Sequence, residues 1–402
     1  MTVNDMASSK VAVCIIIENL PAPMDRRVWQ EARTLTAAGY RVSIICPKGS
    51  GFNLSHETLE GVEIHRYRIW EASGPLGYLI EYAWALAAQF FLALRVYGRT
   101  RFRALQACNP PDTIFLIGLF FKLFGVRFIF DHHDLNPELF ETKFGRKGFF
   151  YRLVCLAERL TFRSADVAIA TNDSYRQIAL TRGGVPPERS FVVRSCPDLD
   201  SLRLEAPRPA LKEGKAHLVV YLGVMGPQDG LDLLLESISI LAKKESRDDT
   251  LFVLIGAGTE VPALKAAARA KGLDDVVRFP GRLPDDEVGA YFATADLGVA
   301  PDPKNAMNDA STMNKVLEYM AYGLPVVLYD LTEGRRSAGD AALYALNNDP
   351  IDFARQMAKL LDSESLRREL GHRGRRRIEE RLNWRIERKA LLESYRTALR
   401  RD

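Results

Sequence analysis

The stretch STMNKVLEYMAYGLPVVLYD, residues 311–330, contains both kinds of element that recur along this chain. An apolar segment with helical spacing runs through a Gly-Leu-Pro turn into a short strand of Val, Leu and Tyr. Lys315 and Glu318 lie one helical turn apart inside this otherwise apolar segment. Such a pair is either a surface ion pair at i, i+3 spacing or part of a binding site.

The same alternation of short strands and longer helical segments fills both halves of the sequence. Strand-like runs lie at 11–17, 40–47, 62–69, 126–134 and 166–173, and again in LVVYLGVM, TLFVLIGAG, VVRFPG, LGVAPDP and LPVVLYD. This order predicts two doubly wound α/β domains with parallel sheets, which bind ligands at the carboxyl ends of their strands. The proline-rich, charged segment 196–217 is predicted to be the linker, and the domains are expected at 1–200 and 201–383.

Composition excludes several classes of function. The chain has 402 residues and a net charge of +4, which is too small to indicate nucleic-acid binding. The five cysteines show no paired spacing, so neither a disulfide framework nor a zinc site is expected. Residues 1–10 lack the apolar core of a signal peptide, and we expect a cytoplasmic protein. The sequence has no Walker A, HExxH or GxSxG motif.

Taken in order, six segments resemble a known family. STMNKVLEYMAYGLPVV, YLGVMGPQDGLDLLLESI and VRFPGRLPDDEVGAYFATADLGVAPD resemble the second domain of retaining glycosyltransferases of the GT-B fold, in particular glycosyltransferase family 4. ENLPAPMDRRVWQEARTLTAAGYRVSIICP and FDHHDLNPELF look like the first domain of bacterial polysaccharide glycosyltransferases. NWRIERKALLESYRTAL looks like the tail helix of this fold. The resemblance implies two Rossmann-like domains facing a central cleft, with a helix at 384–402 that crosses back onto the first domain.

The resemblance also implies an activity. It is the transfer of a hexose from a nucleotide diphosphate sugar to a growing, lipid-linked saccharide in cell-surface polysaccharide biosynthesis, with retention of configuration and with no cofactor or metal. Two alternatives stay open: a nucleotide-sugar 2-epimerase of the same fold, and a GT-B-like partner subunit that binds sugar without catalysis.

For the nucleotide-sugar donor, the resemblance indicates a binding site at the start of the helix within residues 311–330. Ser311 or Thr312 can cap that helix, whose unpaired N–H groups and positive dipole end suit a diphosphate. Asn314 and Lys315 are expected beside the phosphates. Glu318 resembles the second acid of the family's E-x7-E motif, which binds the ribose hydroxyls.

The sequence departs from the family at several donor positions. The first acid of E-x7-E falls on Ala310, and Asp302 or Asp309 is expected to replace it. Val224 and Asp229 stand where many relatives have Arg and Lys for the diphosphate.

Other groups are then expected to bind the phosphates. The backbone N–H groups of Gly223 and Gly226 are expected to do part of that work. Arg194 and Arg282 are the next candidates.

On the acceptor side, FDHHDLNPELF follows an apolar strand. His133 matches the family position that contacts the transferred sugar, and His133, Asp134 and Glu318 are the expected catalytic residues. Glu138 is expected on the acceptor side. Arg26 and Arg27 either meet the phosphate of a lipid-linked acceptor or are solvated. A metal site in this stretch is not expected, because adjacent strand residues point to opposite faces.

Residues 76–103 raise the question of membrane contact. Their apolar run is interrupted by Glu81 and Gln89 and followed by arginines, which favours an interfacial helix over a spanning one. The alternative is a buried helix that covers the sheet. Basic and aromatic residues at 144–163 favour peripheral attachment to the inner membrane face.

Overall fold

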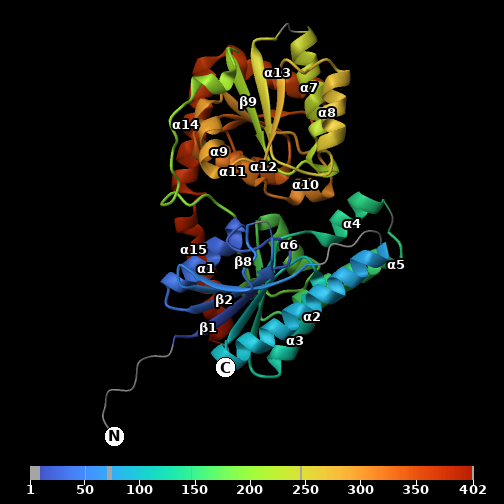
Figure 1. Cartoon of the computed structure of the whole chain (residues 1–402), viewed down its shortest axis with the longest axis vertical. Coiled ribbons are helices and arrows are strands. Elements are labelled where there is room, and N and C mark those ends of the chain that lie inside the picture. The colour runs from blue at the N-terminus through green and yellow to red at the C-terminus, as the bar shows by residue number, and fades with distance from the viewer. Residues whose placement is uncertain (1–9, 50, 70–74, 146, 245–246, 401–402) are drawn as a thin grey trace. The chain divides into compact units, whose positions relative to one another are not determined.

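The computed structural model of the protein describes residues 10–49, 51–69, 75–145, 147–244 and 247–400, and it consists of two α/β units (Figure 1). The first unit comprises Met1–Arg194 together with Glu387–Asp402, and the second comprises Ser195–Ile386. The first unit thus ends several residues before the expected position 200.

The first unit is built on a sheet with strand order β3-β4-β2-β1-β5-β6-β7-β8, in which every pair is parallel except β3 and β4. Most of its strands are buried along their length, which explains their runs of Val, Ile and Phe. The strands are β1 (Ala12–Ile16), β2 (Arg41–Pro47), β3 (His56–Leu59), β4 (Val62–Tyr67), β5 (Ala104–Cys108), β6 (Arg127–His132), β7 (Val167–Ala170) and β8 (Ser190–Val192).

Helices connect these strands as crossovers. Asp25 and Asn172 cap two of them, by accepting from the N–H groups of Val28 and Tyr175. The helices are α1 (Arg26–Ala37), α2 (Pro75–Thr100), α3 (Phe115–Lys122), α4 (Asn136–Phe144), α5 (Phe149–Ser164) and α6 (Asp173–Thr181), with single 3₁₀ turns at Asp112–Ile114 and Pro187–Arg189.

Helix α2 covers the first sheet with one face, as the second sequence-based alternative proposed. Ala85, Ala93 and Val96 on that face are buried in the core. Gln89, which interrupts the apolar run, is also buried and donates hydrogen bonds to Glu18 and to the Tyr67 hydroxyl. Among the described residues, no helix combines the length and apolar content that crossing a membrane requires.

The second unit has a fully parallel sheet with strand order β11-β10-β9-β12-β13-β14. Its strands are β9 (His217–Leu222), β10 (Thr250–Ile255), β11 (Val277–Gly281), β12 (Leu297–Ala300), β13 (Val326–Tyr329) and β14 (Ala342–Ala345). Its helices are α7 (Leu231–Lys244), α8 (Val261–Ala270), α9 (Asp285–Thr294), α10 (Ala306–Ala310), α11 (Asn314–Ala321), α12 (Thr332–Ala338), α13 (Pro350–Asp362) and α14 (Glu364–Glu380), with 3₁₀ turns at Pro209–Lys212 and Pro227–Asp229.

The segment 196–217, predicted as a linker, packs on the second unit. Cys196 is buried in the core of that unit, and Leu199, Leu202 and Leu211 pack against it. The prolines and charges of this segment thus mark an irregular path over the second core rather than a solvated connection.

Helix α15 (Trp384–Leu399) begins in the second unit and continues onto the first. Tyr395 is fully buried, and its hydroxyl donates to Oε1 of Gln106 in β5 at 2.6 Å. The ring of Tyr395 also contacts Tyr40, with 5.9 Å between centroids. The predicted fold, two doubly wound units with a tail helix that returns to the first, is therefore confirmed (Figure 1).

Candidate functional site

Each sheet has one position where the strand order reverses direction. In the first sheet β1 lies between β2 and β5, and in the second β9 lies between β10 and β12. Connections leave such a position toward opposite faces of the sheet, and the loops after the strands therefore leave room for a ligand. In both units, charged side chains gather in the loops after these strands or their neighbours.

In the second unit, Lys315 is the centre of this group. Its Nζ donates to both carboxylate oxygens of Asp302, at 2.8 and 3.0 Å. Asp302 follows β12 and is 2% exposed, while the Lys315 side chain is 10% exposed. Nζ also lies 4.9 Å from the ring centroid of Tyr221, at the end of β9. Lys315 thus forms its ion pair with Asp302. This differs from the i, i+3 surface ion pair with Glu318, which was one of the two sequence-based alternatives.

The charge on Lys315 is maintained by these neighbours. Burial alone lowers the pKa of a lysine, but the Asp302 carboxylate outweighs it, and the pKa of Lys315 is raised above its usual value. Burial in turn raises the pKa of Asp229, although Lys315 opposes the shift. The site therefore holds a permanent cation next to a fully buried acid and a second acid of raised pKa.

The expected cap of α11 is wrong. The helix begins at Asn314 and its N-cap is Met313, which makes no side-chain cap hydrogen bond. Ser311 instead follows the preceding helix α10 as its C-cap and donates through Oγ to the carbonyl of Met307 in that helix. Ser311 and Thr312 precede the helix by too many residues to occupy the capping position.

The glycine loop after β9 is packed differently from the prediction. The N–H of Gly223 donates to Ile255 O at 3.1 Å, and that of Gly226 donates to Oδ2 of Asp229 at 2.8 Å. A Cβ on Gly256 would lie 1.8 Å from Gly223 O, and this loop therefore packs backbone against backbone on the loop after β10. Both N–H groups are therefore engaged within the protein and are not open to a diphosphate in this structure.

The remaining donor-side candidates lie around this cluster or away from it. Asp309 accepts from the N–H and hydroxyl of Thr332, both at 2.8 Å, which leaves Asp302 as the acid beside Lys315. Asn314 and Arg282 are exposed, the first at the start of α11 and the second after β11. Glu318 is half-buried in the middle of α11.

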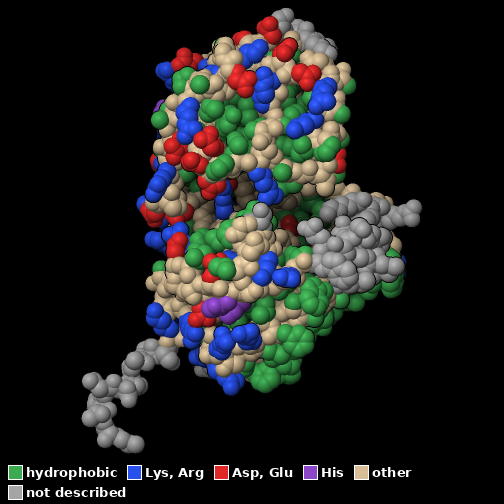
Figure 2. Space-filling view, in the orientation of Figure 1, with side chains coloured by type: hydrophobic (Ala, Val, Ile, Leu, Met, Phe, Trp, Pro, Cys, Tyr) green, Lys and Arg blue, Asp and Glu red, His purple; other side chains and the backbone are tan. Residues whose placement is uncertain are grey.

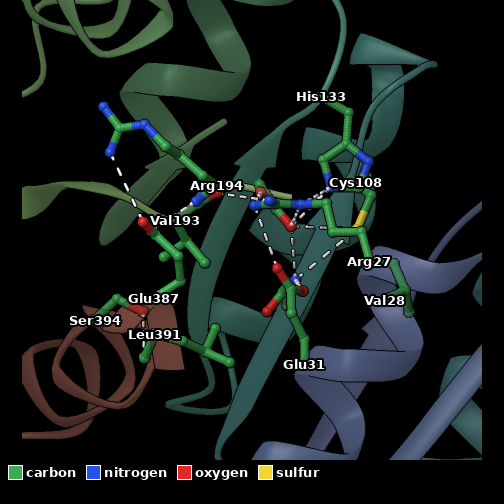
Figure 3. Close-up of polar contacts among 12 residues, drawn as sticks. Arg27, Val28, Glu31, Cys108, His133, Val193, Arg194, Glu387, Leu391 and Ser394 are labelled. Carbon is green, nitrogen blue, oxygen red and sulfur yellow. Dashed lines mark hydrogen bonds and ion pairs between the residues drawn. The ribbon is translucent and has the colours of Figure 1, made fainter. Parts of the chain in front are cut away.

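Arg194 belongs to the other unit. Its guanidinium pairs with Asp173, and its N–H donates to Glu387 of α15 at 2.8 Å. Its expected role at the donor phosphates is therefore not supported by its place in the structure, which is at the junction of the tail helix with the first unit (Figure 3).

In the first unit, a buried ionic cluster lies after β6 (Figure 3). Arg27 of α1 is 7% exposed and binds Asp131 through Nη2 at 2.8 Å, and it also pairs with Glu31 at 3.2 Å. Its Nη1 donates to Val193 O at 2.6 Å. Neither sequence-based alternative for Arg27, phosphate contact or solvation, fits this buried position.

His133 is attached to the same cluster. Its Nε2 lies 2.8 Å from Oδ2 of Asp131 and 3.0 Å from Nε of Arg27. Nε2 donates to Asp131 when it carries a proton and accepts from Nε of Arg27 when it does not. Burial alone lowers the pKa of His133, but Asp131 outweighs it and raises that pKa well above its usual value. The side chain of His133 is 14% exposed, and its raised pKa favours the imidazolium form.

The pKa values of the two acidic residues in the cluster are shifted in opposite directions. Burial works against ionisation of Asp131, but Arg27 and His133 hold its pKa well below its usual range. Burial and the neighbouring Asp131 raise the pKa of Glu31. Gln106 of β5 donates to both acids, at 2.6 Å to Glu31 and 3.0 Å to Asp131. Asp131 and Arg27 contact His133 directly, and Glu31 and Gln106 bind these two residues in turn. The cluster thereby fixes the orientation of His133.

The other acceptor-side candidates have different surroundings. The N–H of Asp134 donates to Oδ1 of Asn109 at 3.2 Å, and its carbonyl accepts from Nδ2 of the same residue. Glu138 pairs with Arg182 at 2.6 Å. Arg26 is exposed on α1, directly before the buried Arg27.

Sequence reasoning missed most of the residues around His133. Asp131 was noticed only as part of the FDHHD stretch, and Glu31, Gln106 and Tyr395 were not considered. The available signals were the polar Gln106 inside the apolar strand LQAC and the i, i+4 spacing of Arg27 and Glu31.

Comparisons with known proteins agree with the fold. The model "Glycosyl transferase 4-like domain" matches residues 24–196, and "Glycosyl transferases group 1" matches residues 216–363. D-inositol 3-phosphate glycosyltransferase of Thermobispora bispora is 27% identical over 261 residues, which are 61% of this chain and 59% of that protein. Matches to the first curated relatives span about half to three fifths of their length.

Solved structures match over nearly the whole chain. Anabaena Alr3699/HepE in complex with UDP and glucose has a TM-score of 0.70 at 15% identity, covering 96% of this chain and 99% of that one. WaaG, a glycosyltransferase involved in lipopolysaccharide biosynthesis, has a TM-score of 0.70 at 18% identity, covering 95% and 98%. At these identities the likeness shows the fold.

Proposed function

Because this chain belongs to the family 4 glycosyltransferases of the GT-B fold, we propose that it transfers a hexose from a nucleotide diphosphate sugar to a growing, lipid-linked saccharide. In this reaction the bond from the anomeric carbon to the phosphate oxygen breaks and a bond to an acceptor oxygen forms. The acceptor proton leaves with the diphosphate. Retention of configuration is part of the proposal and rests on the family alone. No described residue is assigned as a nucleophile that would support it separately.

The observation that carries the proposal is the buried cation at the reversal point of the second sheet. Lys315 lies at the start of α11, between Tyr221 near the end of β9 and Asp302 after β12. The leaving nucleoside diphosphate is an anion, and a fixed cation beside a helix N-terminus stabilises it in the transition state. Lys315 would exchange Asp302 for the phosphates when the donor binds. This arrangement supplies the positive charge that a metal provides elsewhere, and we propose metal-independent transfer.

The first unit supplies a second cationic group. His133, held as an imidazolium by Asp131, follows β6 at the ligand-binding edge of the first sheet. An imidazolium donates hydrogen bonds to sugar hydroxyls and stabilises negative charge that develops near the reacting carbon. This supports a role for His133 in the transfer step.

Two structural relatives support the substrate classes. HepE was solved with UDP and glucose, and WaaG acts in lipopolysaccharide biosynthesis. For this chain they favour a nucleotide sugar as donor and a cell-surface polysaccharide as product.

We further propose that the protein works at the inner membrane face, and that α3 and α5 of the first unit contribute the contact. Apolar side chains of these helices and of the two residues after α3 are 37–82% exposed: Leu116, Leu119, Leu123, Phe124, Phe149, Phe150, Leu153, Leu156 and Leu160. Hydrophobic side chains gather along the same edge of the first unit in Figure 2. Arg152, Arg159 and Arg163 of α5 are exposed as well. Apolar groups flanked by arginines suit an anionic lipid surface.

Vesicle binding tests this surface. The double variant Phe150→Glu, Leu153→Glu should lose sedimentation with anionic vesicles, because it puts two charges where apolar side chains would insert. The wild type should bind less as salt rises. Ile351→Glu is the matched control, since Ile351 is 62% exposed on the second unit. Equal binding by wild type and the α5 variant would contradict the assignment.

A donor screen tests the proposed activity. The protein is incubated with radiolabelled nucleotide sugars and a membrane lipid extract, and label is followed into the lipid fraction. Transfer from one donor is the expected result. Conversion of the donor into its 2-epimer, without need of an acceptor, would support the epimerase. Binding of sugar without turnover of any donor would support the partner subunit, which Ala310 and Val224 at family donor positions make a specific alternative.

A further inference from the structure

The hairpin formed by β3 and β4 has a fixed register. Its turn residues Glu60 and Gly61 have φ angles of 48° and 83°, and two consecutive positive φ values are typical of a type I′ turn. A two-residue turn of this kind sets the pairing of the strands, which places His56 opposite His65.

The two histidines form a close cross-strand pair. The N–H of Arg66 donates to Ser55 O at 2.9 Å, and the neighbouring His56–His65 pair is therefore a non-hydrogen-bonded one, where facing side chains come closest. Their ring centroids are 4.7 Å apart. Glu63 lies two residues before His65, on the same face of β4.

These three side chains bring their ligand atoms together. One atom from each lies within 4.8 Å of the other two, and Nε2 of His65 is 3.9 Å from Oε2 of Glu63. His65 is 5% exposed, and its Nε2 is buried without a hydrogen-bond partner among the described residues. A buried polar atom without a partner costs free energy, and this one faces the carboxylate and the second imidazole.

The surroundings hold Glu63 in place and leave an entry path. Oε1 of Glu63 accepts from Nη2 of Arg41 at 2.7 Å, so that Oε2 remains on the His65 side. His56 is exposed, and an ion can therefore enter from solvent. The positive charges of Arg95 and Arg99 act on His65 and oppose a cation. An ion at this site must therefore be one that bonds strongly to imidazole, because charge alone would not hold it there.

We propose that His56, Glu63 and His65 bind a divalent transition-metal ion, best matched by Zn²⁺, with a fourth position open to water. Two imidazoles and one carboxylate are a known zinc ligand set. Bonds of about 2.0–2.1 Å place tetrahedral ligand atoms about 3.4 Å apart, which small rotations of the exposed His56 and of the Glu63 carboxylate would achieve. The ligands lie within the strands of an edge hairpin and not in the loops of the proposed transfer site, and the ion would tie β3 to β4.

The test measures binding of Zn²⁺ and Co²⁺ to the full chain after dialysis against a chelator. Isothermal titration should show one Zn²⁺ per chain with a rise in Tm, and Co²⁺ should give a tetrahedral visible spectrum. His56→Ala should weaken binding by more than about 100-fold, beyond the 10–100-fold range of changes outside the ligand set. It replaces an exposed side chain, and circular dichroism checks that it folds.

His372→Ala is the matched control, because His372 is an exposed histidine on α14 of the second unit. It should bind Zn²⁺ as the wild type does. Glu63→Gln keeps the shape of the side chain and should also weaken binding. A wild type that binds no Zn²⁺, or a His56→Ala protein that binds it with unchanged affinity, overturns the proposal.

Discussion

Replacing Lys315 by Met should destabilise the second unit, and adding Asp302→Asn should restore it. Asp302 is 2% exposed, and its two hydrogen bonds from Lys315 are 2.8 and 3.0 Å long. Removing one partner of a buried ion pair leaves an uncompensated charge and costs about 3–5 kcal/mol, whereas removing both charges is often close to neutral. The double-mutant cycle should therefore give a coupling energy of about 2 kcal/mol or more.

Urea unfolding followed by hydrogen exchange of α11 and β12 peptides measures this effect within the second unit, since a chain of two units does not unfold in one step. A Lys315→Met protein as stable as the wild type would contradict a buried pair. Equal losses in the single and double variants would contradict the coupling.

The same pair of variants separates stability from function. The double variant should fold and still lose about 2–4 kcal/mol of transition-state stabilisation, a fall in kcat/KM of roughly 30- to 900-fold, because the cation on the leaving diphosphate is gone. A stable double variant with normal kcat/KM would refute the role of Lys315, and exposed Arg282 would then be the next phosphate candidate.

His133→Ala should lower kcat far more than donor affinity, since the imidazolium acts mainly in the transition state; unchanged turnover would remove it from the site. Glu318→Gln should weaken binding of the nucleotide sugar and of free nucleoside diphosphate alike, measured by calorimetry, while leaving the unfolding midpoint unchanged. His132→Phe should flatten the pH dependence of stability. Burial lowers the pKa of His132 to about 3, so that below the ordinary pKa of about 6.5 only the unfolded chain takes up its proton and stability falls toward acid. If the unfolding midpoint changed equally between pH 7 and pH 5 in the wild type and in the His132→Phe variant, this would be contradicted.

Much of the fold follows from local signals. Buried parallel strands need unbroken runs of Val and Ile, and such runs with helical segments between them predicted both sheets. The β3–β4 hairpin was missed because its turn is Glu60-Gly61, and a glutamate at positive φ carries none of the Asn-Gly or Asp-Gly signal of such turns. The packing of the 196–217 segment could not be predicted, because its few leucines contact a core that only the folded chain assembles.

Candidate residues could be chosen from the sequence, but their partners could not. His133 and Lys315 could be chosen because each follows a strand or begins a helix near a sheet edge. Their partners could not, because Arg27 and Asp131 are 104 residues apart in the chain and meet only through the order of β1, β5 and β6. The cap of α11 failed for a simpler reason: the helix starts at Asn314, and helix starts are the least certain feature of a periodic pattern.

The central claim is most directly tested by counting products when acceptor is added to enzyme and nucleotide sugar. The account predicts that one nucleoside diphosphate is released for each glycosidic bond formed, that release depends on the acceptor, and that the new bond has the anomeric configuration of the donor by NMR. Release of nucleoside diphosphate at the same rate without acceptor, or a product of inverted configuration, would contradict it.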